Sequence, residues 1–243
     1  MDPIWLIIAV LVALAYVVQT AAGFGAGIVL LTLGGQLVSI PELIAVMVPL
    51  SLLQTSWIAW RYREGICWSF LIKQVLPLMG SAMVVTFWLA KDVDAGHLKV
   101  WFGAMVLVLS LRELWALRRP GRASPVSATG GVLALLSAGV VHGIYATGGP
   151  LLVYAAGRQG FNKLNFRSTI TMVWVLINSV LVVQLALAGR FSMETPKRQL
   201  MVVWGVPIGV VIGEWLYRRV DEHRFKVSVF GLLALASVAL LFN

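Results

Sequence analysis

Charge is what this chain has least of. Only 12% of its 243 residues are charged and 60% are hydrophobic, whereas a soluble globular domain carries about 25% charged residues. The mean hydropathy is +0.90. These charges are too few to cover a surface in water, which excludes almost any soluble enzyme. We therefore expect an all-α, polytopic membrane protein.

Several other absences exclude classes of chemistry. Cys67 is the only cysteine, so no internal disulfide can form. The chain has no Walker motif and no His-Glu-x-x-His, which excludes an ATP-driven pump acting by itself and gives no support to intramembrane hydrolysis. No acidic residue lies clearly in mid-span. Glu214 comes nearest and is expected to pair with Arg218, four residues on. We expect no enzyme, no metal and no cofactor.

The few charges that are present are mostly basic, with a formal net charge of +9. The Lys and Arg residues form short clusters between apolar runs, where they usually fix topology by collecting on the cytoplasmic side. Binding of lipid headgroups is the alternative, and no nucleic acid is expected. The start of the chain lacks the basic segment of a signal peptide, so the first apolar segment is expected to stay in the mature protein.

Charge-free windows occur at 3–41, 43–60, 74–90, 100–111, 123–157, 168–189, 199–213 and 227–243. Counted once each, they give eight spans. The first and fifth windows would form straight helices of about 52–58 Å, too long for a hydrocarbon core of about 30 Å. Each contains a glycine cluster near its middle, at 21–27 and 143–150. We expect a helix, a break and a shorter returning helix in each window.

The distribution of basic residues supports the two breaks. With eight spans, the two sides of the membrane carry 10 and 9 Lys and Arg residues. Breaking both windows gives ten segments and places 14 on one side and 5 on the other, as the positive-inside rule requires. Both termini are then expected on the non-cytoplasmic side.

The two halves of the chain resemble each other. The segment 89–94 matches 216–221, Phe102–Gly103 matches Phe230–Gly231, and Pro77 matches Pro207. The expected organisation is a first repeat at 1–119, a basic linker at 120–125 and a second repeat at 126–243. Five segments in each half imply an inverted 5+5 repeat, with substrate bound near the midplane at the breaks.

These motifs resemble the sulfite exporter TauE/SafE family of membrane permeases. The resemblance is strongest in the run from Gly143 to Leu152, followed by Lys163, an Arg-x-Thr at 167–169 and a membrane-embedded Asn178. Thr147 stands where that family often has glycine, and Ala26 interrupts the first glycine run. The resemblance implies an integral protein of the bacterial cytoplasmic membrane that carries sulfite, organosulfonates or related oxyanions.

The glycine clusters are the expected substrate site. A glycine at a helix start lets an anion approach backbone N–H groups at the positive end of the helix dipole. The alternative is that these glycines only permit close helix packing. The glycines concerned are Gly23, Gly25 and Gly27 in the first cluster, and Gly148 and Gly149 in the second.

Polar residues near the clusters complete the expected substrate-binding set. Gln54 and Asn178 lie at mid-membrane depth, where they bind substrate or only join helices. His142, next to the second cluster, suits coupling to a proton or contact with an anion. Arg167 either attracts the anion at a vestibule or extends to the interface. The remaining hydroxyl-bearing candidates are Thr20, Tyr145, Thr147 and Thr169.

The sequence therefore predicts a secondary transporter for a small anion, working by alternating access around two glycine breaks. An anion channel with the same site is one alternative. A non-transporting membrane subunit or enzyme is the other. The sequence leaves open the transported anion, the direction of transport and the oligomeric state.

Overall fold

The computed structural model describes residues 3–90, 128–157 and 159–221, with single positions between 104 and 115 and between 223 and 238. Every regular element in these ranges is a helix. Five helices are long and apolar enough to cross a membrane, namely Pro3–Ala22, Ile40–Arg61, Trp68–Leu89, Lys163–Leu187 and Thr195–Arg219. The expected all-helical membrane architecture is confirmed for this part of the chain. The linker 120–125 and most of the windows 100–111 and 227–243 lie outside the described residues.

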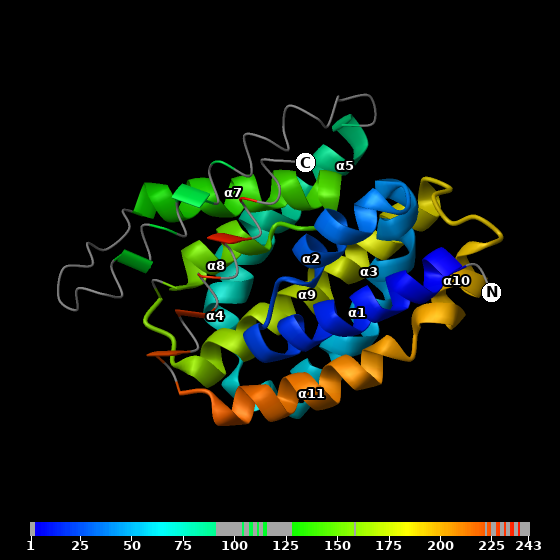
Figure 1. The fold of residues 1–243 in the computed structure, drawn as a ribbon. Coiled ribbons are helices and arrows are strands. Elements are labelled where there is room, and N and C mark those ends of the chain that lie inside the picture. The colour runs from blue at the N-terminus through cyan, green and yellow to red at the C-terminus, as the bar shows by residue number, and fades with distance from the viewer. Residues whose placement is uncertain are drawn as a thin grey trace.

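The first described half begins with the expected broken helix (Figure 1). Helix α1 ends where the glycine cluster begins, and a shorter helix follows after three residues. The elements of this half are α1 (Pro3–Ala22), α2 (Ala26–Leu33), η1 (Gly34–Gln36), α3 (Ile40–Arg61), η2 (Arg63–Gly65), α4 (Trp68–Phe70), η3 (Leu71–Gly80) and α5 (Ser81–Leu89).

The second described half also begins with a broken helix, which confirms the other predicted break. Its elements are α7 (Ala128–Tyr145), α8 (Gly149–Gly157), α9 (Lys163–Leu187), α10 (Thr195–Val202) and α11 (Gly205–Arg219). Local sequence sets the ends of α9 and α11. The Asn162 side chain accepts a hydrogen bond from the Asn165 N–H at the start of α9, while Arg218 and Arg219 lie in the last turn of α11.

Helices from different halves pack closely through glycine. Gly205, Gly209 and Gly213 lie along one face of α11 against α1, and a Cβ at Gly209 would come within 2.9 Å of the Tyr16 backbone carbon. Gly139 and Gly143 of α7 approach η3 and α5 in the same way. Small residues let helix backbones approach in membranes. In both pairs residue numbers rise together along the contact, so the two helices run parallel.

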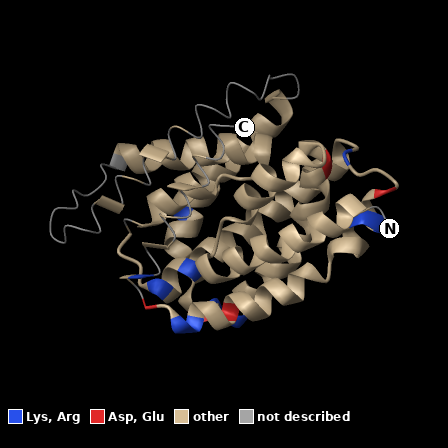
Figure 2. Cartoon of the chain, viewed as in Figure 1, with Lys and Arg blue, Asp and Glu red and all other residues tan. Residues whose placement is uncertain are grey.

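The bundle has one strongly basic end (Figure 2). Helices α3 and α11 end there and α9 begins there, because Gly65 contacts Leu164 and Ser168, and Lys163 donates to the Tyr217 carbonyl. We call this the basic end; its described basic residues include Arg61, Arg63, Lys163, Arg218 and Arg219. The N-terminus lies at the opposite end (Figure 1), which we call the N-terminal end.

Candidate functional site

The first break is made by two glycines with left-handed backbone. Gly23 has φ 86° and Gly25 has φ 108°, conformations that side-chain-bearing residues rarely adopt. The carbonyl of Gly23 accepts a hydrogen bond from the Trp174 indole N–H at 2.8 Å. The break is therefore tied to α9, and Phe24 is buried between them.

The second break is held by a side chain rather than by glycine conformation alone. Ala146 has φ 53°, a strained value for an alanine. Two residues later, the N–H of Gly148 donates to Nδ1 of His142 at 3.2 Å. The histidine thus fixes the path of the chain as it leaves α7 and enters α8.

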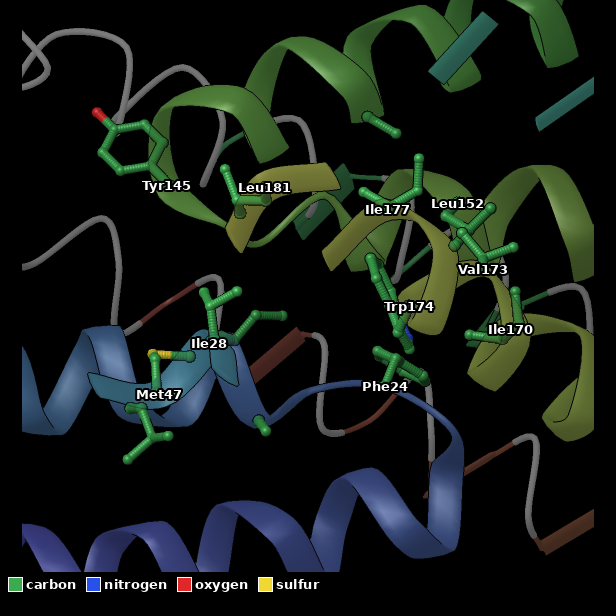
Figure 3. Packing of buried hydrophobic residues seen from close by; sticks show 14 of the residues in the cluster. Phe24, Ile28, Met47, Tyr145, Leu152, Ile170, Val173, Trp174, Ile177 and Leu181 are labelled. Atoms are coloured by element: carbon green, nitrogen blue, oxygen red, sulfur yellow. The ribbon is translucent and has the colours of Figure 1, made fainter. Parts of the chain in front are cut away.

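The two breaks lie against each other. A Cβ at Gly27 would come within 3.2 Å of the Ala146 carbonyl oxygen and the Thr147 side chain, and one at Gly149 would contact Phe24 and Trp174 at 3.5–3.6 Å. Figure 3 shows Trp174 pointing from α9 to Phe24. The starts of α2 and α8 are therefore brought to one place, as the sequence predicted.

A small cavity of about 30 Å³ lies where the breaks meet, with room for about one or two water molecules. We call it the central cavity. It is lined by Gln19, Gly25, Gly27, Ile28, Met47, Val48, Ser51, His142, Ala146, Thr147, Gly149, Trp174 and Asn178. Gly27 and Ile28 belong to the first turn of α2, where N–H groups have no acceptor within the helix. These N–H groups are therefore donors available to a bound anion.

One line of polar side chains crosses the wall of this cavity. Gln19 donates to Ser51 Oγ at 3.1 Å, and the Asn178 amide donates to the same oxygen at 3.4 Å. Oδ1 of Asn178 lies 3.0 Å from Nε2 of His142. Together with the bond from Gly148 to His142, this polar chain connects α1, α3, α9 and α7 to the second break.

The polar chain fixes the protonation pattern of His142. Its Nδ1 accepts from Gly148, so Nε2 carries the proton and donates to Asn178. The ring is therefore neutral in this arrangement, and it stacks on Trp174 with a centroid distance of 5.4 Å. Every residue that lines the central cavity is uncharged. An anion there would be held by neutral donors and by the positive ends of α2 and α8.

A larger cavity of about 460 Å³ leads from this site to the N-terminal end. We call it the vestibule. It shares His142 and Ala146 with the central cavity and reaches the surface at Arg190, an exposed residue. Its lining is mainly apolar and consists of Ile40, Pro41, Ile44, Phe87, Ala90, His142, Gly143, Ile144, Tyr145, Ala146, Leu181, Leu185, Ala188 and Arg190. Tyr145 thus lies in the vestibule.

Gln54 and Thr20 pair with each other instead of lining the central cavity. The Gln54 amide donates to Thr20 Oγ1 at 2.6 Å and to the Tyr16 carbonyl at 2.9 Å. Thr20 also faces α11 at Gly213. For Gln54, the interhelical hydrogen bond that the sequence left open as an alternative is what the structure shows, and Thr20 is its partner.

Arg167 is buried in the protein, with an exposed fraction of 1%. It forms an ion pair with Glu214 of α11, and its guanidinium lies 4.7 Å and 3.9 Å from the ring centres of Tyr62 and Tyr217. Glu214 does approach Arg218 as expected, at 4.0 Å, but its buried partner is Arg167. The side chain of Arg167 therefore does not extend to the membrane interface.

Thr169 and Lys163 hold neighbouring segments in place. Thr169 Oγ1 accepts a hydrogen bond from the Cys67 N–H at 2.9 Å. Lys163 donates to the carbonyls of Tyr217 and Val220 at the end of α11. Both residues act near the basic end, outside the lining of the central cavity.

Sequence reasoning missed Ser51 and Trp174 as lining residues. Trp174 precedes Asn178 by four residues and follows Arg167 by seven, a spacing that places all three on one face of α9. Ser51 precedes Gln54 by three residues on α3. The shared helix face of Arg167, Trp174 and Asn178 could have identified Trp174 as a lining residue from the sequence. Among the described residues, no group of three or more His, Cys, Asp or Glu side chains could hold a metal ion.

Comparison with known proteins connects this geometry to one family. No curated protein and no solved structure matched the chain. The family model described as "Sulfite exporter TauE/SafE" matches residues 7–240, nearly the whole chain. This family consists of membrane permeases for sulfite and related anions. The chain is therefore an integral membrane protein that belongs to the sulfite exporter TauE/SafE family.

Proposed function

We propose that this protein is a secondary transporter for a small oxyanion, with sulfite or an organosulfonate as the expected substrate class. The observation that carries the proposal is the central cavity, where two helix starts meet beside a chain of neutral hydrogen-bond donors. Neutral donors suit transport, because a site must hold its anion and also release it.

The central cavity has room for only about one or two water molecules and so is too small for a hydrated oxyanion, which can enter with its water only if the two breaks separate. The vestibule already connects the site to the N-terminal end. Toward the basic end, the buried side chains of Trp174, Phe24 and Arg167 fill the space. The described residues thus fit one state of an alternating-access cycle, open at one end and closed at the other.

The packing supports an inverted repeat. Helix α1 packs on α11 from the other half, and α7 packs on η3 and α5 from the other half, each pair running parallel. Helices α3 and α9 occupy equivalent places in their halves and pack on each other. We assign the basic end to the cytoplasmic side by the positive-inside rule, which places the N-terminus and the mouth of the vestibule on the other side.

The test is counterflow in proteoliposomes. Vesicles loaded with unlabelled sulfite should accumulate labelled sulfite transiently, with saturation at high concentration. Conductance without counterflow would favour an anion channel. Lack of both flux and binding, across sulfite, sulfonates, thiosulfate and carboxylates, would favour a non-transporting subunit.

Access to the vestibule gives a second test. Leu185 lines the vestibule, whereas Ser168 is fully buried near the basic end. In a Cys67→Ser background, Leu185→Cys should react with a membrane-impermeant maleimide added to the non-cytoplasmic side of the membrane. Ser168→Cys is the matched control and should not react. Equal reaction at both positions would contradict a state that is open at one end only.

A further inference from the structure

Near the basic end, Arg167 and its neighbours hold a carboxylate inside the protein. Arg167 lies there at 1% exposure and forms an ion pair with Glu214, whose side chain is 11% exposed. The Tyr62 hydroxyl donates to the other oxygen of the Glu214 carboxylate at 2.5 Å. The carboxylate is thus held by a guanidinium and a phenol, a donor set that suits any small oxyanion.

The guanidinium has more donors than Glu214 uses. Nε and Nη1 of Arg167 are buried, and neither meets the distance and angle of a hydrogen bond among the described residues, although the Tyr217 side chain also interacts with the guanidinium. The guanidinium carbon lies over both tyrosine rings, 4.7 Å from the centre of Tyr62 and 3.9 Å from that of Tyr217. A guanidinium can donate two parallel hydrogen bonds to one oxyanion, and here a buried pair of donors is left for that use.

The position of the pair suits a role in transport. Arg167 lies directly beside the first break, since a Cβ at Gly23 would be 3.4 Å from its Cα. Glu214 belongs to α11, which packs on α1 through Gly205, Gly209 and Gly213. The ion pair therefore joins α9, which carries Trp174 and Asn178, to the α1–α11 pair at the closed end of the site.

We propose that the carboxylate of Glu214 occupies a substrate position on Arg167, and that the transported oxyanion displaces it when the protein opens at the basic end. This inference rests on the proposed transport function. Glu214 then acts as an internal competitor: it compensates the buried charge of Arg167 while the site is closed and leaves when a substrate anion arrives. No covalent bond changes in this exchange.

The direct test is sulfite binding to purified, full-length protein. Glu214→Gln keeps the size of the side chain but removes the competing charge, so the Kd for sulfite should fall about tenfold. Glu194→Gln is the matched control, because Glu194 pairs with Lys197 in an exposed, i,i+3 ion pair, and its Kd should not change. An unchanged or higher Kd in Glu214→Gln would overturn the inference.

Glu214→Gln also leaves a buried guanidinium uncompensated, which destabilises folded proteins. Tyr62→Phe avoids that problem, because it removes only the hydroxyl that holds the carboxylate. It should lower the Kd for sulfite in the same direction, about threefold. Sulfite should raise the melting temperature of both variants more than that of the wild type. An equal rise in all three proteins would count against the exchange.

The rate of maleimide labelling at Cys67 reports opening of the basic end and does not depend on transport activity. This residue lies near the basic end, where its N–H contacts Thr169 and its sulfur accepts from the Asn165 amide at 3.2 Å. Weakening the ion pair should open this end, so Glu214→Gln should speed maleimide labelling of Cys67 several-fold in the absence of added anion. Unchanged labelling would contradict a closing role for the pair.

The outcomes separate the inference from the function on which it rests. If wild-type protein binds sulfite and Asn178→Ala raises the Kd at least tenfold, while Glu214→Gln and Tyr62→Phe leave the Kd and the Cys67 labelling unchanged, only the inference fails. If folded wild type and all variants bind no sulfite and show no flux, the proposed function itself fails.

Discussion

The backbone N–H of Gly148 donates to Nδ1 of His142, six residues earlier in the chain, at 3.2 Å. This bond joins the second break to a side chain of the helix that precedes it. Because Nε2 of the same ring faces Asn178, this one side chain links the break to α9. The histidine is therefore the point where the path of the backbone and the polar wall of the central cavity meet.

Loss of the partner of His142 on α9 should weaken substrate binding. Asn178→Ala removes the acceptor for Nε2–H and a donor to Ser51, which leaves buried polar groups unsatisfied at a cost of about 1–3 kcal/mol each. We expect the Kd for sulfite to rise at least tenfold, measured by titration calorimetry. Gln184→Ala is the control, since Gln184 lies on the same helix but donates to the Val84 carbonyl. An equal loss in both variants would contradict a specific role for Asn178.

Strain at the second break predicts a stabilising substitution. Ala146 has φ 53°, and the left-handed conformation costs an L-residue roughly 1–2 kcal/mol. Ala146→Gly should therefore raise the melting temperature of the detergent-solubilised protein. Ala155→Gly is the control with opposite sign: it lies buried in the middle of α8, where glycine costs up to about 1 kcal/mol. A lower melting temperature for Ala146→Gly would show that the strain is absent.

Substitution of Thr169 should distinguish two roles for this residue of the family pattern: binding of substrate, or holding the segment at Cys67 in place. The Thr169 hydroxyl accepts from the Cys67 N–H, and Thr169 does not line the central cavity. Thr169→Val keeps the shape and removes the acceptor, so Cys67 should react faster with maleimide while the Kd for sulfite changes less than about twofold, well under 1.4 kcal/mol. Ser179→Ala is a control, because Ser179 donates only to the Val175 carbonyl within α9. A large rise in Kd for Thr169→Val would restore the substrate-binding role.

The breaks could be predicted because two independent constraints locate them. A membrane limits the length of a straight helix, and glycine marks where an over-long apolar window can turn. The observed ends of α1 at Ala22 and α7 at Tyr145 fall at the predicted clusters. The resemblance to the permease family rested on the same motifs and is confirmed over residues 7–240.

The orientation of single side chains could not be predicted in the same way. Gln54 and Asn178 are both polar residues within long apolar helices, yet Asn178 lines the central cavity and Gln54 contacts Thr20 and Tyr16. The rotation of a helix about its axis is read from its polar face, and these helices are apolar nearly all round. The burial of Arg167 could not be predicted for a different reason: it depends on an ion pair with Glu214, 47 residues away in the chain.

Close packing of α1 on α11 should depend on the glycine at position 209. Gly209→Ala would place a Cβ within 2.9 Å of the Tyr16 backbone carbon, so the helices must separate at a cost of about 1–3 kcal/mol. Gly131→Ala adds the same methyl group to α7, where nothing lies within 4 Å, and improves helix propensity by up to about 1 kcal/mol. Melting temperatures should therefore shift in opposite directions. Because Tyr16 also donates to the Met47 carbonyl of α3, Gly209→Ala should in addition lower transport rates. If both variants melt like the wild type, close glycine packing does not hold these helices together.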